Sequence, residues 1–416
     1  MEKGLITNKN RLFIVKNLLF VLFVVFCIQF TELKIDVIKA SEILLLLLTP
    51  FLYFKKINKW VLMILTLFIA WFILTMFFNY FRNFYLLENV SALKTPYLIS
   101  IGRFLELISC VNLTTLIYLF FKDKSKKEIQ QYIQDIYEFC FVILIINVVI
   151  YFLYMQDYLA ETRMVYWGDR LRGWFGEGGP YGLMLSFTFC LSFFYKHKYH
   201  LFTRSIIVLV TIFLADSKAG FILILMWFFV YYYGKIYKKL RELNIIVLIL
   251  SGFFLSFVFS KLAIHYISDI TNIKREIAER PTDINLIMGR IAGVYIFPEM
   301  IKDYPLLGIG LGNYPIMRNN PEYLGVIPKS PRGESDSHGF GGLVQLLVDG
   351  GFLVFLVFLY IIYLFYKKIR PLNEGLEKFI FIFLCFFMFG VQLYFLYPWV
   401  LFGILISLGS KKKLHG

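Results

Sequence analysis

The sequence has too few charged residues to cover a soluble protein of its length. Asp, Glu, Lys and Arg make up 17% of its 416 residues, whereas hydrophobic residues make up 59% and aromatic residues 19%. Soluble domains carry about a quarter of charged residues. An ordinary globular core does not bury this much apolar surface, so composition excludes a soluble fold and predicts an integral membrane protein.

Cysteine and the common cofactor motifs are also scarce. The five cysteines lie inside apolar runs without paired spacing, so we predict neither a disulfide framework nor a zinc site. The sequence has no Walker loop, dinucleotide fingerprint, H-E-x-x-H or D-x-D motif. We therefore expect no metal, no cofactor and no nucleotide donor from the cytoplasm. If the protein transfers a group, we expect its donor to be in the membrane already.

Long apolar runs are present instead, and about twelve of them can cross a hydrocarbon layer of about 30 Å. They are apolar on every side, which predicts helices rather than barrel strands. No small-residue cleavage site follows the first run, so we interpret it as a retained helix. The expected spans are 12–30, 37–54, 60–78, 97–121, 135–155, 179–195, 205–216, 220–233, 245–262, 342–366, 378–396 and 398–410.

One basic cluster, "NKNR", precedes the first apolar run, and six more follow alternate runs. These six read "KKINK", "KDKSKK", "KHKYH", "KKLR", "KKIR" and "KKK". This alternation is the positive-inside pattern, and it predicts an even number of spans with both termini in the cytoplasm. The net charge of +15 would indicate nucleic acid only if the cations shared one solvated face. Because they do not, we expect contact with membrane lipid and no nucleic-acid partner.

The chain divides into three parts under this topology. Residues 1–260 are an N-terminal transmembrane bundle, 261–341 an external loop region, and 342–416 the C-terminal transmembrane helices. The middle part is the only sizeable region without a continuous apolar run. We expect two or three short helices there and a glycine-rich turn at "GIGLGN". The predicted fold class is an all-α integral membrane protein with about twelve transmembrane helices and one large external loop.

Two arginines oppose the charge bias that orients the chain. Arg170 and Arg172 stand in "RLRGWFGEGGPYG", on the expected outer side, and the segment leads through Gly178, Gly179 and Pro180 into a span. The planar arginine fork suits phosphate oxygens, and a helix N-terminus adds positive potential. An acidic ligand is the functional interpretation. The alternative is a pair of arginines that face solvent or lipid headgroups.

Two pairs of ionisable residues interrupt apolar runs. Asp216 and Lys218 in "DSKAG" are functional candidates if they lie at membrane depth, where charge is costly. If they form the tip of a hairpin, both simply meet water. Arg103 and Glu106 lie three residues apart on one helical face and are expected to neutralise each other. A water-filled cleft is the alternative for that pair.

Arg290 is a single cation on an amphipathic stretch of the external region. Tertiary structure could bring it to Arg170 and Arg172. Guanidinium groups that converge on one pocket need an anion, so convergence would imply a phosphorylated ligand. The alternative is an ion pair from Arg290 to Glu299 or Asp303.

His338 in "ESDSHGFGG" precedes a span on the same expected side. Histidine titrates near neutral pH, so this side chain is the natural candidate to accept a hydroxyl proton. Glu334 and Asp336 could orient it or raise its pKa. A structural histidine beside ordinary loop acids is the alternative.

The order of these segments resembles the O-antigen ligase and O-antigen polymerase superfamily. The resemblance runs roughly from 170 to 352, through "RLRGWFGEGGPYG", "DSKAG", "GRIAGVYIFPEMIKDYPLLGIGLGNY" and "SHGFGGLVQLLVDGGF". It implies a glycosyltransferase of the bacterial cytoplasmic (inner) membrane, whose donor glycan is linked to undecaprenyl diphosphate on the outer leaflet. The first-motif arginine would be Arg170 or Arg172, the arginine of the external helix Arg290, and the motif histidine His338.

The chain departs from the family pattern at three places. Ser217 and Lys218 stand where the family usually has Ser-Arg, which keeps the charge and loses the bidentate fork. Gly339 follows the histidine where asparagine is typical. The segment 177–180 reads Glu-Gly-Gly-Pro where Asn-Pro-Asn is frequent. These departures leave the substrate open.

The resemblance and the residues together favour a metal-independent, inverting polymerase of O-antigen or capsule repeat units. Arg170, Arg172, Arg290 and Lys218 would hold the diphosphate, with Arg290 and His338 catalytic. A chain-length regulator and a flippase are the expected partners. A ligase that transfers polymer to lipid A core is the nearest alternative. A transporter is less favoured, because it would carry ionisable residues along several spans and matching halves.

Overall fold

A computed structural model describes most of the chain. The described residues are 17–31, 33–35, 38–53, 57–82, 84, 95–160, 162–166, 169–195, 198–242, 269–287, 289–328, 340–372 and 375–411. His338 and the expected span 245–262 lie outside these residues. Helices dominate the described part, and two antiparallel pairs of two-residue strands join them.

Four of the described helices are long and apolar enough to cross a membrane. They are α4 (Lys59–Phe81), α5 (Pro96–Phe121), α6 (Lys126–Met155) and α16 (Gly342–Ile369), the last extended to Leu372 by a 3₁₀ turn. Shorter apolar helices span Asn17–Gln29, His200–Leu214, Lys218–Tyr233 and Leu396–Gly409. The prediction of a helical membrane protein is confirmed, whereas the number of twelve spans stays a prediction.

The expected span 37–54 is not one helix, so that prediction was wrong. Strand β1 (Lys34–Ile35) pairs with β2 (Ile38–Lys39), and α2 (Ala40–Leu47) and α3 (Thr49–Tyr53) follow as separate helices. Pro50 stands in the first turn of α3 and has no N–H to donate to the preceding turn. The helix therefore breaks at Leu48.

The expected span 378–396 is also wrong at its end. Helix α17 (Leu376–Met388) stops well before residue 396, and α18 (Leu396–Gly409) begins after a loop that includes Gly390. Gly390 has φ of 103°, in the left-handed region that glycine adopts without strain. This residue ends the helix although the surrounding sequence remains apolar.

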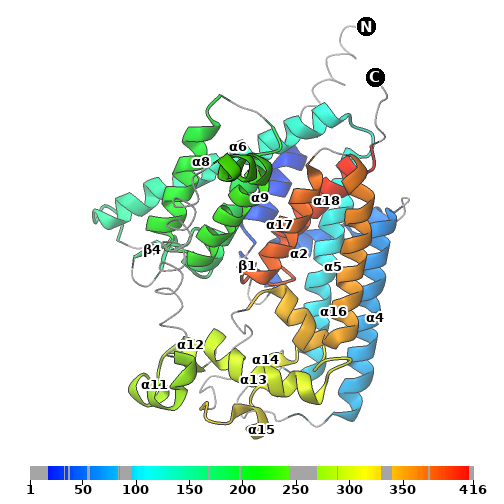
Figure 1. Cartoon of the computed structure of the whole chain (residues 1–416), viewed down its shortest axis with the longest axis vertical. Coiled ribbons are helices and arrows are strands. Elements are labelled where there is room, and N and C mark those ends of the chain that lie inside the picture. The colour runs from blue at the N-terminus through cyan, green and yellow to red at the C-terminus, as the bar shows by residue number, and fades with distance from the viewer. Residues whose placement is uncertain are drawn as a thin grey trace.

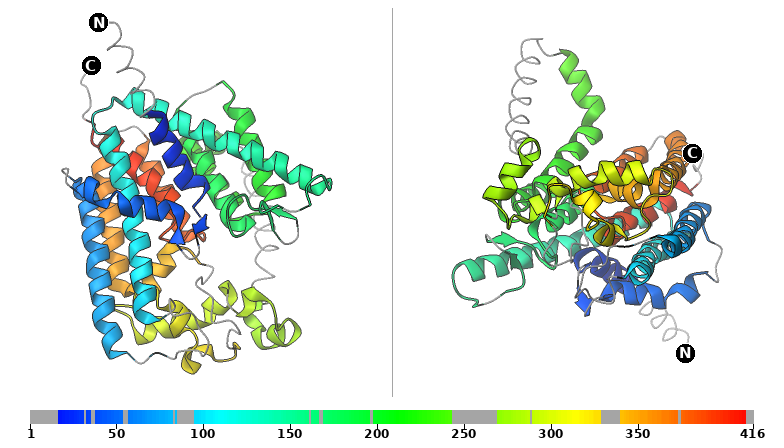
Figure 2. Two further views of the ribbon diagram at one scale, coloured as in Figure 1. Left: turned by 180° about the vertical axis from the view of Figure 1, so that it is seen from behind. Right: turned by 90° about the horizontal axis from the view of Figure 1, so that it is seen from below.

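The main bundle packs α5 between α4 and α18, with α16 against α4 and α17 (Figures 1 and 2). The core is aromatic, and the rings of Phe68 and Trp399 lie edge to face with centroids 5.8 Å apart. A Cβ added at Gly403 would lie 3.0 Å from Cβ of Ile117. The small residue therefore lets α18 approach α5 closely, as is common between membrane helices.

A second group of helices joins the bundle through α17. It contains α6, α7 (Gly178–Leu191), α8 (His200–Leu209) with the π-helical turn η2 (Val210–Leu214), and α9 (Lys218–Glu242). The chain reverses between η2 and α9 within Ala215–Ser217. The expected spans 205–216 and 220–233 thus form a helical hairpin with a short tip.

The inserted region, defined here as residues 269–328, gathers at one end of the bundle (Figure 1). Its described part holds five short helices, more than the two or three expected: α11 (Ile273–Glu279), α12 (Ile284–Ile287), α13 (Arg290–Asp303), α14 (Tyr314–Met317) and α15 (Pro321–Leu324). Apolar side chains of these helices form a core of their own. The region is therefore a packed unit rather than an open loop.

Lysines mark the opposite end of the bundle. Nζ of Lys411 donates to the carbonyl oxygen of Lys122 at 2.6 Å, and Lys59 and Lys368 both lie over the ring of Trp60. These residues end or begin α18, α5, α4 and α16. Four of the basic clusters, "KKINK", "KDKSKK", "KKIR" and "KKK", thus share one end of the bundle, as the positive-inside pattern requires. The sidedness itself stays a prediction.

The glycine-rich turn 308–313 inserts between the bundle helices. Gly308, Gly310 and Gly312 have φ of 62°, 96° and 75°, a conformation in which other residues are strained. The N–H of Leu311 donates to Oγ1 of Thr75 on α4 at 3.0 Å. The turn ties the inserted region directly to the membrane helices.

Polar side chains complete this attachment. Nδ2 of Asn313 donates to Oδ1 of Asn79 at 2.7 Å, and the hydroxyl of Ser100 donates to the carbonyl of Leu311 at 2.8 Å. All of these side chains are buried. Helix α16 is interrupted at Gly351, and the freed N–H of Phe352 donates to the carbonyl of Pro305 at 2.8 Å.

Candidate functional site

Arg170 joins two motifs that are far apart in the sequence. It stands on β4 (Arg170–Leu171), which pairs with β3 (Val165–Tyr166). Its Nε and Nη2 each donate to the carbonyl of Ala215 at 3.2 Å, and Nη2 donates to the carbonyl of Asp216 at 2.8 Å. The guanidinium group therefore caps the carbonyls that close η2 and sets the position of the hairpin tip.

Helices α7 and α9 begin side by side beneath this tip. Oγ of Ser217 donates to the carbonyl of Gly179 at 3.0 Å and accepts from the N–H of Gly220 at 3.2 Å. A Cβ added at Gly182 would lie 2.1 Å from Cβ of Ser217, and one at Gly220 would lie 2.5 Å from the carbonyl oxygen of Gly182. The glycines of both motifs are needed for this close approach, and two helix N-termini add positive potential nearby.

Gly182→Ala is expected to disrupt this contact, because its methyl group has no room beside Ser217. We expect loss of about 1–3 kcal/mol of folding free energy, typical of an overpacked core. The measurement is thermal unfolding of the purified protein in detergent. Gly179→Ala is the matched control, because a Cβ there meets nothing within 4 Å. Equal unfolding temperatures for the two variants would contradict the close packing of α7 and α9.

Lys218 is the first residue of α9, and both it and Asp216 are exposed. Asp216 has φ of 44°, and its carboxylate lies 3.8 Å from Nε of Arg170. This arrangement favours the hairpin-tip interpretation, in which the two side chains face water or a ligand rather than the bundle interior. Lys218 and Arg170 are thus the predicted site residues that the structure brings to one place.

Arg172 donates hydrogen bonds within the loop that precedes α7. Its Nε donates to the carbonyl of Arg163 at 2.7 Å, and its Nη1 donates to the carbonyl of Gly176 at 3.0 Å. Of the two candidates for the first-motif arginine, Arg170 is therefore the one that contacts Ala215 and Asp216, directly before Ser217 and Lys218. The described contacts give Arg172 a role in shaping the loop that precedes α7.

Arg290 is the exposed first residue of α13, in the inserted region. The carboxylates proposed as its alternative partners are engaged elsewhere: Glu299 pairs with Lys302 at 3.3 Å, and Asp303 accepts from the hydroxyl of Tyr323 at 3.0 Å. Arg290 stands in the inserted region, whereas Arg170 stands on β4 beside the hairpin tip. The convergence of the arginines on one anion therefore stays a prediction.

Arg318 is a cation that the sequence did not single out. It is 1% exposed, and its Nη2 donates to the carbonyl of Ile287, just before the helix that Arg290 begins. Its Nε and Nη1 have no hydrogen-bond partner in the described structure, and burial lowers its pKa. An arginine directly after the apolar "YPIM" was the available signal. Its contact with the 287 carbonyl secures the segment that leads into α13.

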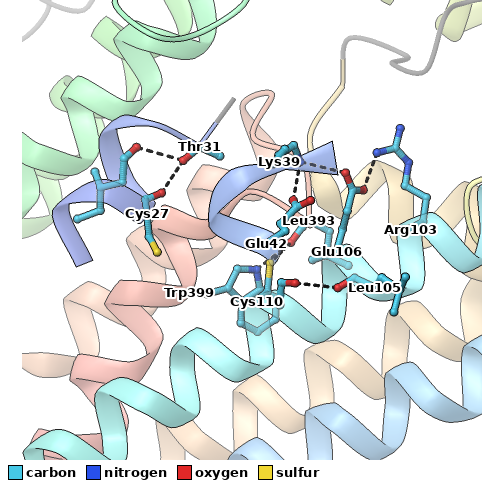
Figure 3. Close-up of polar contacts among 12 residues, drawn as sticks. Cys27, Thr31, Lys39, Glu42, Arg103, Leu105, Glu106, Cys110, Leu393 and Trp399 are labelled. Carbon is cyan, nitrogen blue, oxygen red and sulfur yellow. Dashed lines mark hydrogen bonds and ion pairs between the residues drawn. The ribbon is translucent and has the colours of Figure 1, made fainter. Parts of the chain in front are cut away.

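A buried ionic network lies between α2, β2 and α5 (Figure 3). Arg103 and Glu106 form the expected ion pair at 2.6 Å, and Lys39 bonds Glu106 at 3.0 Å and Glu42 at 2.8 Å. Nζ of Lys39 also lies 4.9 Å from the ring centroid of Tyr394. Two cations neutralise two carboxylates, so this network leaves no charge for a substrate. The prediction of mutual neutralisation is confirmed, and Lys39 and Glu42 are the members that sequence reasoning missed.

Metal ligands do not gather in the part of the chain that the structure describes: no group of three or more His, Cys, Asp or Glu side chains is close enough to hold an ion. The chemistry available around the hairpin tip is instead that of cations and helix N-termini. Such groups stabilise negative charge on a phosphate.

The fold and composition define a helical integral membrane protein. Within it, residues 204–359 match the family model described as O-antigen ligase. This match confirms the resemblance over that segment, which contains Lys218, Arg290 and His338, whereas Arg170 and Arg172 precede it. It indicates a membrane enzyme that acts on glycans. Comparison with curated proteins gave no match.

Proposed function

We propose that this protein is a membrane glycosyltransferase that polymerises oligosaccharide repeat units linked to undecaprenyl diphosphate. The observation that carries the proposal is the hairpin tip, where Arg170 binds the turn that presents Lys218, at the start of the segment similar to O-antigen ligases. Cations of this kind suit a substrate that carries phosphate and sits in the membrane.

The proposed reaction is a displacement at the anomeric carbon of the donor glycan. The acceptor hydroxyl forms the new C–O bond, the bond to the diphosphate breaks, and the electron pair leaves with the diphosphate. His338 takes the hydroxyl proton, while Arg290, Arg170 and Lys218 stabilise the departing charge. Attack from the face opposite the leaving group inverts the anomeric centre. No step requires a metal ion.

Arg170 contributes mainly by position in this scheme. Its Nε and Nη2 are occupied by the carbonyls of Ala215 and Asp216, so its charge acts through space while Lys218 extends from α9. Lysine carries charge without the bidentate fork. We therefore propose that Arg290 both orients the phosphate and stabilises its departing charge, whereas Lys218 contributes charge stabilisation alone.

A ligase is the second candidate, because the matching family is described as O-antigen ligase. It would use the same carrier-linked donor and transfer finished polymer to lipid A core. The two enzymes differ in acceptor alone. Cells without a ligase would keep polymer on the carrier, whereas cells without a polymerase would place single repeat units on the core.

The test is turnover by the purified protein in liposomes. Lipid-linked repeat units extracted from cells that lack the protein serve as both donor and acceptor, without nucleotide and without an ion gradient. We expect a ladder of longer lipid-linked glycans. Transfer only to added lipid A core would indicate the ligase. Movement of intact units across the bilayer without new glycosidic bonds would indicate a transporter and contradict the proposal.

A further inference from the structure

A groove of about 630 Å³ opens where the end of α4 meets the inserted region. Phe81 and Arg82 contribute to it from α4, Tyr304 follows α13, and Asn320 and Glu322 come from the start of α15. None of these residues belongs to the hairpin tip or to the buried ionic network. The volume is that of a small-molecule site rather than a packing defect.

The cation in this groove is already engaged. Nη1 of Arg82 donates to the carbonyl of Ile309, and Nη2 donates to the carbonyl of Gly308 at 2.7 Å. Its guanidinium carbon also lies 4.6 Å from the ring centroid of Tyr304. These contacts hold the glycine-rich turn against α4. They leave Arg82 poorly placed to take a phosphate group.

The groove also carries an acid. Glu322 is exposed, and its carboxylate makes no ion pair in the described structure. A free carboxylate repels phosphate and accepts hydrogen bonds from hydroxyl groups. Oδ1 of neighbouring Asn320 accepts from the backbone N–H of Glu322 at 3.3 Å. The NH₂ group of the Asn320 side chain is therefore the part that can donate to a ligand.

Aromatic rings and two leucines, Leu306 and Leu307, complete the lining. Phe81 is 65% exposed, and Tyr304 is half-buried. Aromatic faces pack against the C–H faces of sugar rings, while carboxylate and amide groups bind the hydroxyls at their edges. An acyl chain would leave the carboxylate and the amide unsatisfied against hydrocarbon, which is costly. The lining therefore favours a neutral, hydroxyl-rich ligand over a phosphate or a lipid tail.

We propose that this groove binds sugars of the acceptor glycan, outside the diphosphate site. The inference rests on the proposed glycosyltransferase function, which requires a second glycan beside the donor. In this arrangement the hairpin tip and Arg290 handle the phosphates of the carrier. The groove between α4 and α15 holds the sugar units that are not cleaved and selects the acceptor by its shape.

The experiment uses two probes with the full-length protein in nanodiscs. One is the phosphate-free oligosaccharide released by mild acid from the cell's lipid-linked repeat units, and the other is undecaprenyl diphosphate without sugar. We expect Phe81→Ala and Glu322→Gln to weaken oligosaccharide binding about tenfold, as for loss of one stacking partner or one hydrogen bond to a charged group. Binding of undecaprenyl diphosphate is expected to stay unchanged.

Matched controls lie outside the groove lining. Phe51→Ala removes a comparably exposed ring on α3, and Glu299→Gln removes an exposed carboxylate on α13. Both should bind the oligosaccharide like the wild type. Weaker binding of undecaprenyl diphosphate alone in Phe81→Ala would assign the groove to lipid and overturn the proposal.

The outcomes separate this inference from the proposed function. Normal polymerisation and normal oligosaccharide binding in both groove variants would reject the acceptor site and leave the glycosyltransferase intact. Absence of turnover in the wild-type protein, with oligosaccharide binding that depends on Phe81 and Glu322, would reject the function and leave a sugar-binding groove.

Discussion

Replacing Arg290 or His338 with alanine is expected to abolish chain elongation, with turnover at least about 100-fold lower. In the proposed reaction, Arg290 stabilises the negative charge that develops on the diphosphate, and His338 removes the acceptor proton. Alanine can neither stabilise this negative charge nor accept a proton. The measurement is the length distribution of lipid-linked glycan made by purified variants at equal protein concentration.

Two controls sharpen this prediction. Arg275→Ala removes an arginine that is exposed and paired with Glu279 on α11, in the same inserted region, and is expected to elongate normally. Arg290→Lys keeps the charge but loses the bidentate fork, so its activity should fall between wild type and alanine. An unchanged polymer length distribution in Arg290→Ala or His338→Ala, at normal protein level, would argue strongly against the catalytic proposal.

Lys39→Met is expected to cost about 3–5 kcal/mol of folding free energy, the typical loss when one partner of a buried ion pair is removed. The side chains of Lys39 and Glu42 are 6% and 5% exposed, and Lys39 pairs with Glu42 and shares Glu106 with Arg103. Methionine fills a similar volume, so the expected loss is electrostatic rather than steric. Chemical unfolding in detergent, followed by tryptophan fluorescence, measures it.

A compensating variant tests the cause. Lys39→Met combined with Glu42→Gln leaves Arg103 and Glu106 as a neutral pair, so much of the lost stability should return. A Lys39→Met protein as stable as the wild type would mean that water reaches the carboxylates. A double variant no better than the single one would mean that Lys39 acts through its contact with Tyr394.

Local patterns predicted the class of protein well. Apolar runs make helices wherever they stand in lipid, so α4, α5, α6 and α16 could be placed to within several residues at most of their ends from hydropathy alone. The same method failed at 37–54 and 378–396. There a proline or a left-handed glycine ends a helix while the hydrophobicity continues.

Some residues of the candidate site could also be recognised from the sequence, whereas others could not. The motif glycines, Arg170 and Lys218 were recognisable from residue type and order, and the structure joins them at the hairpin tip. The roles of Arg82 and Arg318 were not recognisable. Each donates to backbone carbonyls of residues distant in the sequence, at Gly308 and Ile287. Nothing in the local sequence records such contacts.

The hydropathy of the apolar runs and the order of the basic clusters along the chain are properties of single segments and do not depend on tertiary contacts. They determined that this chain is a helical membrane protein with basic segments between its apolar runs. Tertiary packing decided which charged side chains form ion pairs. Lys39 and Glu106 are 67 residues apart, and only the docking of the β1–β2 pair against α5 brings them within 3.0 Å. A buried charge is stable only beside its counterion, so that choice depends on the assembled helices and not on any single segment.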